Sequence, residues 1–125
     1  MSSYKKSDVV LLIITGFWGF AGVILLAAGA HADGTGRMTS AGTFLLFHAA
    51  AATGLIGSAI LGPRFKLNTL LLLLVGSGVF AADLVSRATR GEGLLPNLAP
   101  TGGTLTMLGW LGVAIGAALK LKSKA

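Results

Sequence analysis

The sequence has no cysteine and few charged residues, and both shortages exclude classes of function. Without cysteine the chain has no disulfide, no thiolate nucleophile and no cysteine-ligated zinc or iron–sulfur site. Charged residues make up 11% of the chain, whereas soluble domains carry roughly 25%. With 54% hydrophobic residues, the composition excludes an ordinary soluble enzyme and indicates a bilayer as the solvent.

Acidic residues are also scarce, because four Asp and Glu stand against ten Lys and Arg and give a net charge of +6. The basic residues lie at the ends of apolar segments instead of gathering on one face. This pattern is typical of membrane anchors and not of a nucleic-acid-binding surface. We therefore expect membrane lipids, and no nucleic acid, among the partners.

Four apolar segments are separated by charged residues, proline or glycine. They predict α-helices at about 9–30, 41–61, 67–85 and 103–119, near the roughly 20 residues that cross a hydrocarbon core of about 30 Å. Only residues 62–66 link the second and third segments, so these two are expected to be antiparallel neighbours. The predicted fold is an all-α membrane protein, a single transmembrane domain over residues 1–125 built as an antiparallel up-and-down bundle.

The first segment has a second interpretation as a secretory signal peptide. Lys5 and Lys6 precede the apolar run, and Ala28-Gly29-Ala30 resembles a cleavage site. The run from 9 to 30 is longer than the 7 to 15 or so apolar residues of a signal peptide, which favours a membrane-spanning helix.

The distribution of basic residues predicts the orientation. Seven lie on the side of the two termini and of the 62–66 link, and three lie on the other side. Because cytoplasmic loops are enriched in Lys and Arg, both termini are expected in the cytoplasm.

Small residues recur at spacings that let helix backbones approach closely. We expect these seams to hold the monomer together, with oligomerisation or a partner subunit as the alternative. They are Gly16, Gly19 and Gly22; Ala50, Gly54 and Ser58; Gly78 and Ala82; and Gly112 and Gly116.

Five stretches in this order carry a resemblance to a known family: Leu26-Ala27-Ala28-Gly29-Ala30-His31-Ala32, Phe47-His48-Ala49, Phe80, Ala99-Pro100-Thr101-Gly102-Gly103 and Leu108-Gly109-Trp110. Over nearly its whole length the chain resembles the YgdD/YwdK-like small inner-membrane proteins, a domain of unknown function. The resemblance implies four spans and a location in the bacterial cytoplasmic (inner) membrane, but no substrate, reaction or cofactor. Asp83 departs from the family pattern.

Three ionisable residues form the candidate polar site within the membrane: His31, His48 and Asp83. Such groups are costly in a bilayer and mark functional hypotheses. A neutral His48 needs partners for its donor and its acceptor, so it is either a structural histidine, bonded to a backbone carbonyl, His31 or Ser77, or a protonatable site in a small polar cavity.

Asp83 also has two interpretations. Arg87 follows it by four residues, which favours an ion pair on one helical face, whereas an inward-facing Asp83 would meet His48 or His31. No His spacing of a helical metal site occurs, and Gly76-Ser77-Gly78 is not the nucleophile elbow of a hydrolase. We therefore predict no catalytic residue, no metal and no cofactor.

Thr101, Gly102 and Gly103 form a second candidate site. Thr101 is a plausible N-cap of the fourth helix, and the two glycines would expose backbone N–H groups to an anion or a lipid headgroup, although a tight helix start is the simpler explanation.

Two functions remain open. The favoured one is a non-catalytic structural or accessory component that packs with lipid or other membrane proteins, as a homo-oligomer or within a larger complex. The alternative is a minimal carrier or pore in which His48 and Asp83 handle protons or a small solute.

Overall fold

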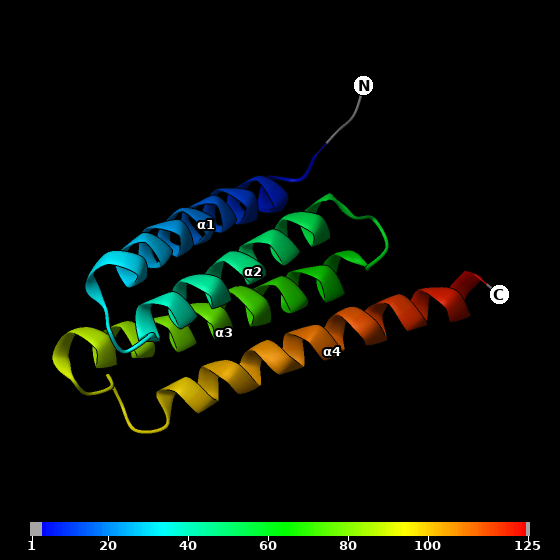
Figure 1. The fold of residues 1–125 in the computed structure, drawn as a ribbon. Helices are drawn as coiled ribbons and strands as arrows, with labels where there is room; N and C mark the ends of the chain where they lie inside the picture. Colours follow the sequence, from blue (N-terminus) through cyan, green and yellow to red (C-terminus); the bar gives the residue numbers. More distant parts are fainter. Residues whose placement is uncertain (1–3, 125) are drawn as a thin grey trace.

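The computed structural model describes residues 4–124, and its regular structure is four α-helices (Figure 1). They are α1 (Lys6–Ala32), α2 (Arg37–Gly57), α3 (Pro63–Arg90) and α4 (Leu98–Lys124). Each is long and apolar enough to cross a membrane. The four predicted helices are thus confirmed, while their boundaries differ from those expected.

Helix α2 ends at Gly57 and not at residue 61, so that part of the prediction is wrong. Ser58 is already extended, with φ −93° and ψ 141°, and Gly62 is extended before Pro63. The proline ring disfavours a helical residue before it, but suits the first position of α3. The link therefore runs from 58 to 62, and α3 begins four residues earlier than predicted.

Successive helices run antiparallel and lie side by side in chain order, which is the predicted up-and-down connection. The start of α1, the end of α4 and the 58–62 link lie at one end of the molecule, called the terminal end below (Figure 1). The other two connections, 33–36 and 91–97, lie at the opposite end, called the loop end.

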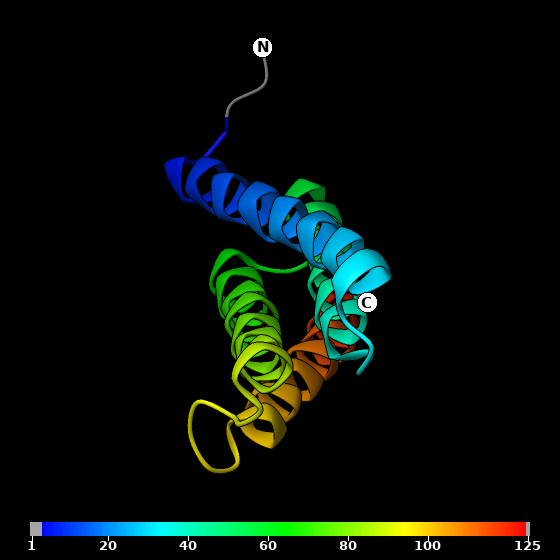
Figure 2. The same ribbon diagram turned by 60° about the vertical axis from the view of Figure 1, so that its left-hand side comes forward.

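The four helices form an open array and not a closed ring. Helix α1 packs on α2, α2 on α3 and α3 on α4, but within residues 4–124 no Cα of α4 lies within 8 Å of one of α1 or α2. Figure 1 shows α1 and α4 at opposite edges of the array, and the turned view of Figure 2 shows α1 above α3 and α4. The core consequently lies between α1, α2 and α3, where Leu11, Ala52, Leu70 and Leu74 pack together.

Glycines allow two of the helix pairs to touch backbone to backbone. A Cβ added at Gly42 of α2 would lie 2.7 Å from the Gly22 carbonyl oxygen of α1. Where α3 and α4 meet, a Cβ on Gly102 would lie 2.6 Å from the backbone nitrogen of Phe80 and 2.8 Å from the Gly76 carbonyl oxygen. Neither pair tolerates a side chain at these positions.

The predicted seams are correct in part: Gly16 of α1 has nothing within 4 Å of an added Cβ, Ala82 of α3 is exposed, and the seam of α2 is wrong. Gly22, Gly112 and Gly116 contact neighbouring helices as expected. Gly54 has nothing within 4 Å of an added Cβ, and Ser58 lies beyond the end of the helix. Small residues cover several faces of α2, so their spacing alone did not identify the packed face.

Candidate functional site

His48 lies on α2 with 6% of its surface exposed, and both of its ring nitrogens have partners. The indole Nε1–H of Trp110 donates to His48 Nε2 at 3.0 Å. Nδ1 therefore carries the ring proton and donates a hydrogen bond to the Phe44 carbonyl oxygen at 2.7 Å. This is the neutral, fully bonded histidine that the structural interpretation expects.

One partner of His48 lies on its own helix, and the other reaches it from α4. Phe44 precedes it by one helical turn, which brings the carbonyl within reach of Nδ1. Trp110 lies on α4, whose backbone does not approach α2, so the side-chain bond bridges the gap between the two helices. Sequence reasoning predicted a backbone carbonyl among the candidate partners, but not Trp110. The signal for Trp110 was that an indole N–H in an apolar environment needs an acceptor.

The space beside His48 is apolar. A groove of about 690 Å³ is lined by the rings of Phe44, Phe80 and Trp110 and by Met107, among others. The Phe44 ring lies 4.5 Å from the His48 ring and 4.3 Å from the Phe80 ring, between centroids. The polar cavity of the second interpretation is therefore not found next to this histidine.

Asp83 is fully buried on α3 and makes the predicted ion pair. Arg87 Nε donates to Asp83 Oδ2 at 2.9 Å, and the backbone N–H of Leu94 donates to Oδ1 at 3.0 Å. Its partners do not include His48 or His31. His31 is exposed near the C-terminal end of α1, so the three candidate residues do not form one site.

The bonds of Asp83 fasten the 91–97 connection to α3. Ser86 Oγ donates to the Glu92 carbonyl oxygen at 2.8 Å. A Cβ added at Gly93 would lie 2.6 Å from Asp83 Oδ1, so only glycine lets the connection approach this closely. The arrangement holds a loop, and each oxygen of the fully buried Asp83 carboxylate accepts a hydrogen bond from within the chain.

Thr101 is not the N-cap of α4, so this prediction is wrong. The helix begins at Leu98, because Asn97 adopts a left-handed φ of 61° that turns the chain one turn earlier. The Thr101 N–H and hydroxyl both donate to the Asn97 carbonyl oxygen, at 3.1 and 2.8 Å. With Gly102 packed against Phe80, the free N–H groups proposed at 101–103 are already inside the helix.

Other chemistry suggested by the sequence finds no matching geometry. Ser77 is fully buried and donates to the Leu74 carbonyl oxygen at 3.1 Å, so it is not paired with His48. Across the described part of the chain, no three His, Asp or Glu side chains lie close enough together to hold a metal ion.

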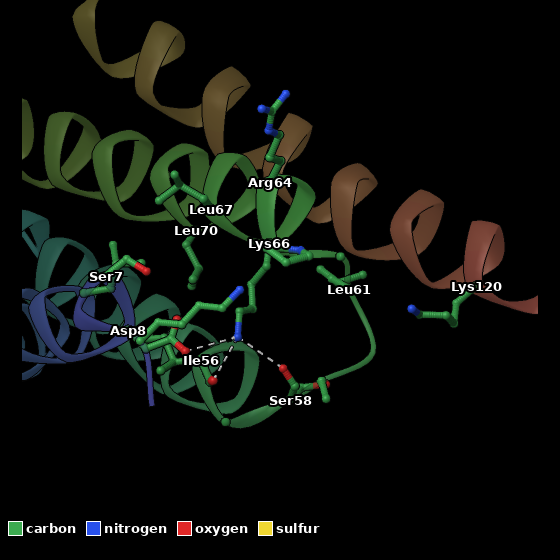
Figure 3. Close-up of a pocket in the computed structure, with 16 residues that line it drawn as sticks. Ser7, Asp8, Ile56, Ser58, Leu61, Arg64, Lys66, Leu67, Leu70 and Lys120 are labelled. Atoms are coloured by element: carbon green, nitrogen blue, oxygen red, sulfur yellow. Dashed lines mark hydrogen bonds and ion pairs between the residues drawn. The ribbon is translucent and has the colours of Figure 1, made fainter. Parts of the chain in front are cut away.

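Lys66, which the sequence suggested only as a membrane anchor, fastens the terminal end (Figure 3). Its Nζ donates to the carbonyl oxygens of Ile56 and Ser58, at 3.2 and 3.3 Å, and lies 3.7 Å from Asp8 Oδ2. One ammonium group thus joins α1, the C-terminal end of α2 and the start of α3. The signal was a lysine directly after a tight link, close to carbonyls that α2 leaves unpaired.

No protein-family model, curated protein or solved structure matches the chain. The resemblance to the YgdD/YwdK-like proteins stays a prediction.

Proposed function

We propose that the chain is a multi-pass protein of the bacterial inner membrane, with both termini in the cytoplasm, and that it is a non-catalytic component packing with lipid or other membrane proteins. One observation carries the proposal: the ionisable side chains buried in the array, His48 and Asp83, are bonded to internal partners. A reactive or transporting group needs a free donor or acceptor facing its substrate.

The outer surface supports a membrane environment. The two edge helices carry large apolar side chains, each with at least two fifths of its surface exposed. This distribution suits contact with lipid or with another membrane protein. They include Val10, Ile13, Phe17, Phe20 and Val23 on α1, and Met107, Leu111, Ile115, Leu119 and Leu121 on α4.

Three of the stretches that carry the family resemblance meet in space. His48 and Trp110 share a hydrogen bond, and Phe80 joins them through the Phe44 ring. These residues therefore support a shared architecture more than a shared reaction. On this basis we place the chain with the YgdD/YwdK-like proteins as part of the proposal.

The orientation is tested with single cysteines, since the chain has none of its own. Gly34→Cys lies in the 33–36 connection, in open space, and Ser123→Cys lies near the C-terminus. In intact spheroplasts we expect a membrane-impermeant maleimide to label Gly34→Cys at once and Ser123→Cys only after permeabilisation. The reverse pattern would overturn the orientation, and labelling of neither after permeabilisation would show that the reagent fails.

The role is tested by extracting the chain from its native membrane in lipid-retaining particles and identifying the copurified proteins and lipids by mass spectrometry. We expect a protein partner in fixed ratio, or a homo-oligomer with lipid. Proteoliposomes of the purified chain should pass no protons. A proton flux that is lost in His48→Gln and kept in Ser77→Ala would contradict the proposal and establish the carrier.

A further inference from the structure

A cleft of about 580 Å³ opens at the terminal end, between the first turn of α1, the 58–62 link, the start of α3 and the C-terminal part of α4. Four cationic side chains line it, and one carboxylate, that of Asp8. The cations are Lys5, Arg64, Lys66 and Lys120. Its volume is that of an ordinary small-ligand site.

The positive charge of this cleft is only partly balanced. Lys66 is used internally, since it pairs with Asp8 and donates to the carbonyl oxygens of Ile56 in α2 and of Ser58 just beyond it. Over the described residues Lys5, Arg64 and Lys120 have no carboxylate within ion-pair distance. Figure 3 shows Lys120 reaching from α4 toward the link, while Arg64 points away from Lys66. The cleft therefore presents unpaired lysine charge.

The same cleft has an apolar wall. Leu67 of α3 lines it with 39% of its surface exposed, next to the nearly buried Leu11 of α1 and Leu61 of the link. A ligand that fits both parts carries an anionic group for the lysines and hydrocarbon for the leucines. The start of α3, which no side chain caps, adds partial positive charge beside the lysines.

We propose that this cleft binds the phosphate headgroup of an anionic phospholipid from the leaflet on the side of the termini, with Lys5 and Lys120 as its contacts. The inference rests on the proposed membrane insertion. An anionic lipid fits better than a free phosphate because the apolar wall lies next to the cations, at the ends of helices whose outer faces are apolar.

The chain supplies a matched control for the test. Lys5→Gln with Lys120→Gln removes two lining charges, whereas Lys6→Gln with Lys122→Gln removes the same charge from the same two segments outside the cleft. Full-length proteins are reconstituted in nanodiscs of phosphatidylglycerol and phosphatidylcholine, and the lipid retained after mild extraction is measured by native mass spectrometry. We expect the lining variant to lose at least about fivefold more phosphatidylglycerol than the control, the effect of one lysine beside a phosphate.

Three outcomes would overturn the proposal. Equal losses in the two variants would mean general attraction of basic termini to anionic lipid, and no loss in either would mean no site. Displacement of the lipid by inorganic phosphate, but not by chloride at equal ionic strength, would assign the cleft to a soluble anion. In each case insertion into the nanodiscs and cysteine labelling would still succeed, whereas failure of the proposed membrane location would abolish them as well.

Discussion

The two ends of the molecule are closed by charges of opposite sign. At the loop end, the Asp33 carboxylate accepts the backbone N–H groups of Thr35 and Met38, at 2.9 and 2.8 Å, beside the start of α2. At the terminal end, Lys66 donates to carbonyl oxygens at the other end of the same helix. Each ion is the one that the dipole of α2 favours at that position.

The ends differ in how completely they are filled. Asp83 draws the 91–97 connection onto α3 by hydrogen bonds, so the loop end is fastened by carboxylates with fixed partners. The terminal end has one bonded lysine and, around it, a hollow with unpaired lysines. The charges of the loop end are thus paired within the chain, whereas the terminal end keeps the unpaired lysines to which the proposed lipid headgroup would bind.

The largest effect is expected at the loop end, from Asp83→Ala. The substitution removes a charge-assisted bond to Arg87 and leaves the N–H of Leu94 without its acceptor. We expect hydrogen exchange of the Leu94 amide to accelerate by about tenfold to a hundredfold, the equivalent of one lost bond to a charged group. Mass spectrometry of peptides over 91–97 measures it.

Glu92→Gln is the control for Asp83, because its carboxylate only reaches Arg90 at 4.0 Å with both side chains exposed. Exchange over 91–97 should stay unchanged in this variant. If Asp83→Ala exchanged no faster than Glu92→Gln, the connection would be held by something other than Asp83.

An effect of similar size is expected at the terminal end, from Lys66→Met. Methionine keeps the length of the side chain but leaves two carbonyls of the α2 end and Asp8 without their donor. We expect the free energy of unfolding in detergent micelles to fall by about 2 kcal/mol. Lys122→Met, at an exposed position of α4, should change it by less than about 0.5 kcal/mol; equal losses would show that Lys66 acts only through net charge.

The sequence predicted the number and order of the helices, because long apolar runs have few alternatives to a helix in a bilayer. The predicted helix ends were wrong, because the helices continue through polar residues beyond the apolar segments from which they were predicted. Lys6 extends α1, Arg90 ends α3, and Leu98 begins α4 beyond the predicted limits. Helix α2 instead ends earlier than predicted, at Gly57, because the chain becomes extended before Pro63 although the apolar segment continues.

The sequence drew attention to His48 and Asp83 as single residues but did not predict all of the bonds that they make. The Asp83–Arg87 pair follows from a spacing of four residues, so the sequence contained it. The bond from Trp110 to His48 joins residues 62 positions apart and depends on how α4 packs on α3. Lys66 escaped notice for a similar reason, because its partner Asp8 comes from another helix.

Trp110→Phe probes the region between the two ends, and a smaller loss is expected there. The change removes the N–H that His48 Nε2 accepts while keeping an aromatic ring beside the groove. We expect the free energy of unfolding to fall by about 1 kcal/mol. A double-mutant cycle with His48→Leu should return a coupling of similar size; a coupling near zero would show that the bond between α2 and α4 contributes nothing to stability.

The smallest effect belongs to Asp33. Its pKa is held below the usual range of an aspartate, first by the Thr35 hydroxyl and then by the N–H groups of Met38 and Thr35. Because the folded pKa is the lower one, the contribution of Asp33 to stability is complete above the usual value, about 3.9, and is lost as the pH falls through the folded pKa.

Unfolding of the wild type and of Asp33→Asn, followed from pH 7 downward, measures this contribution. We expect a small excess stability of the wild type that fades only in acid. Thr35→Val removes the largest cause of the lowered pKa, so in this variant the excess should fade at a higher pH. An excess stability that persisted at a pH where every carboxylate is protonated would show that the charge of Asp33 does not stabilise the start of α2. The two ends of α2 would then no longer be stabilised by charges of opposite sign.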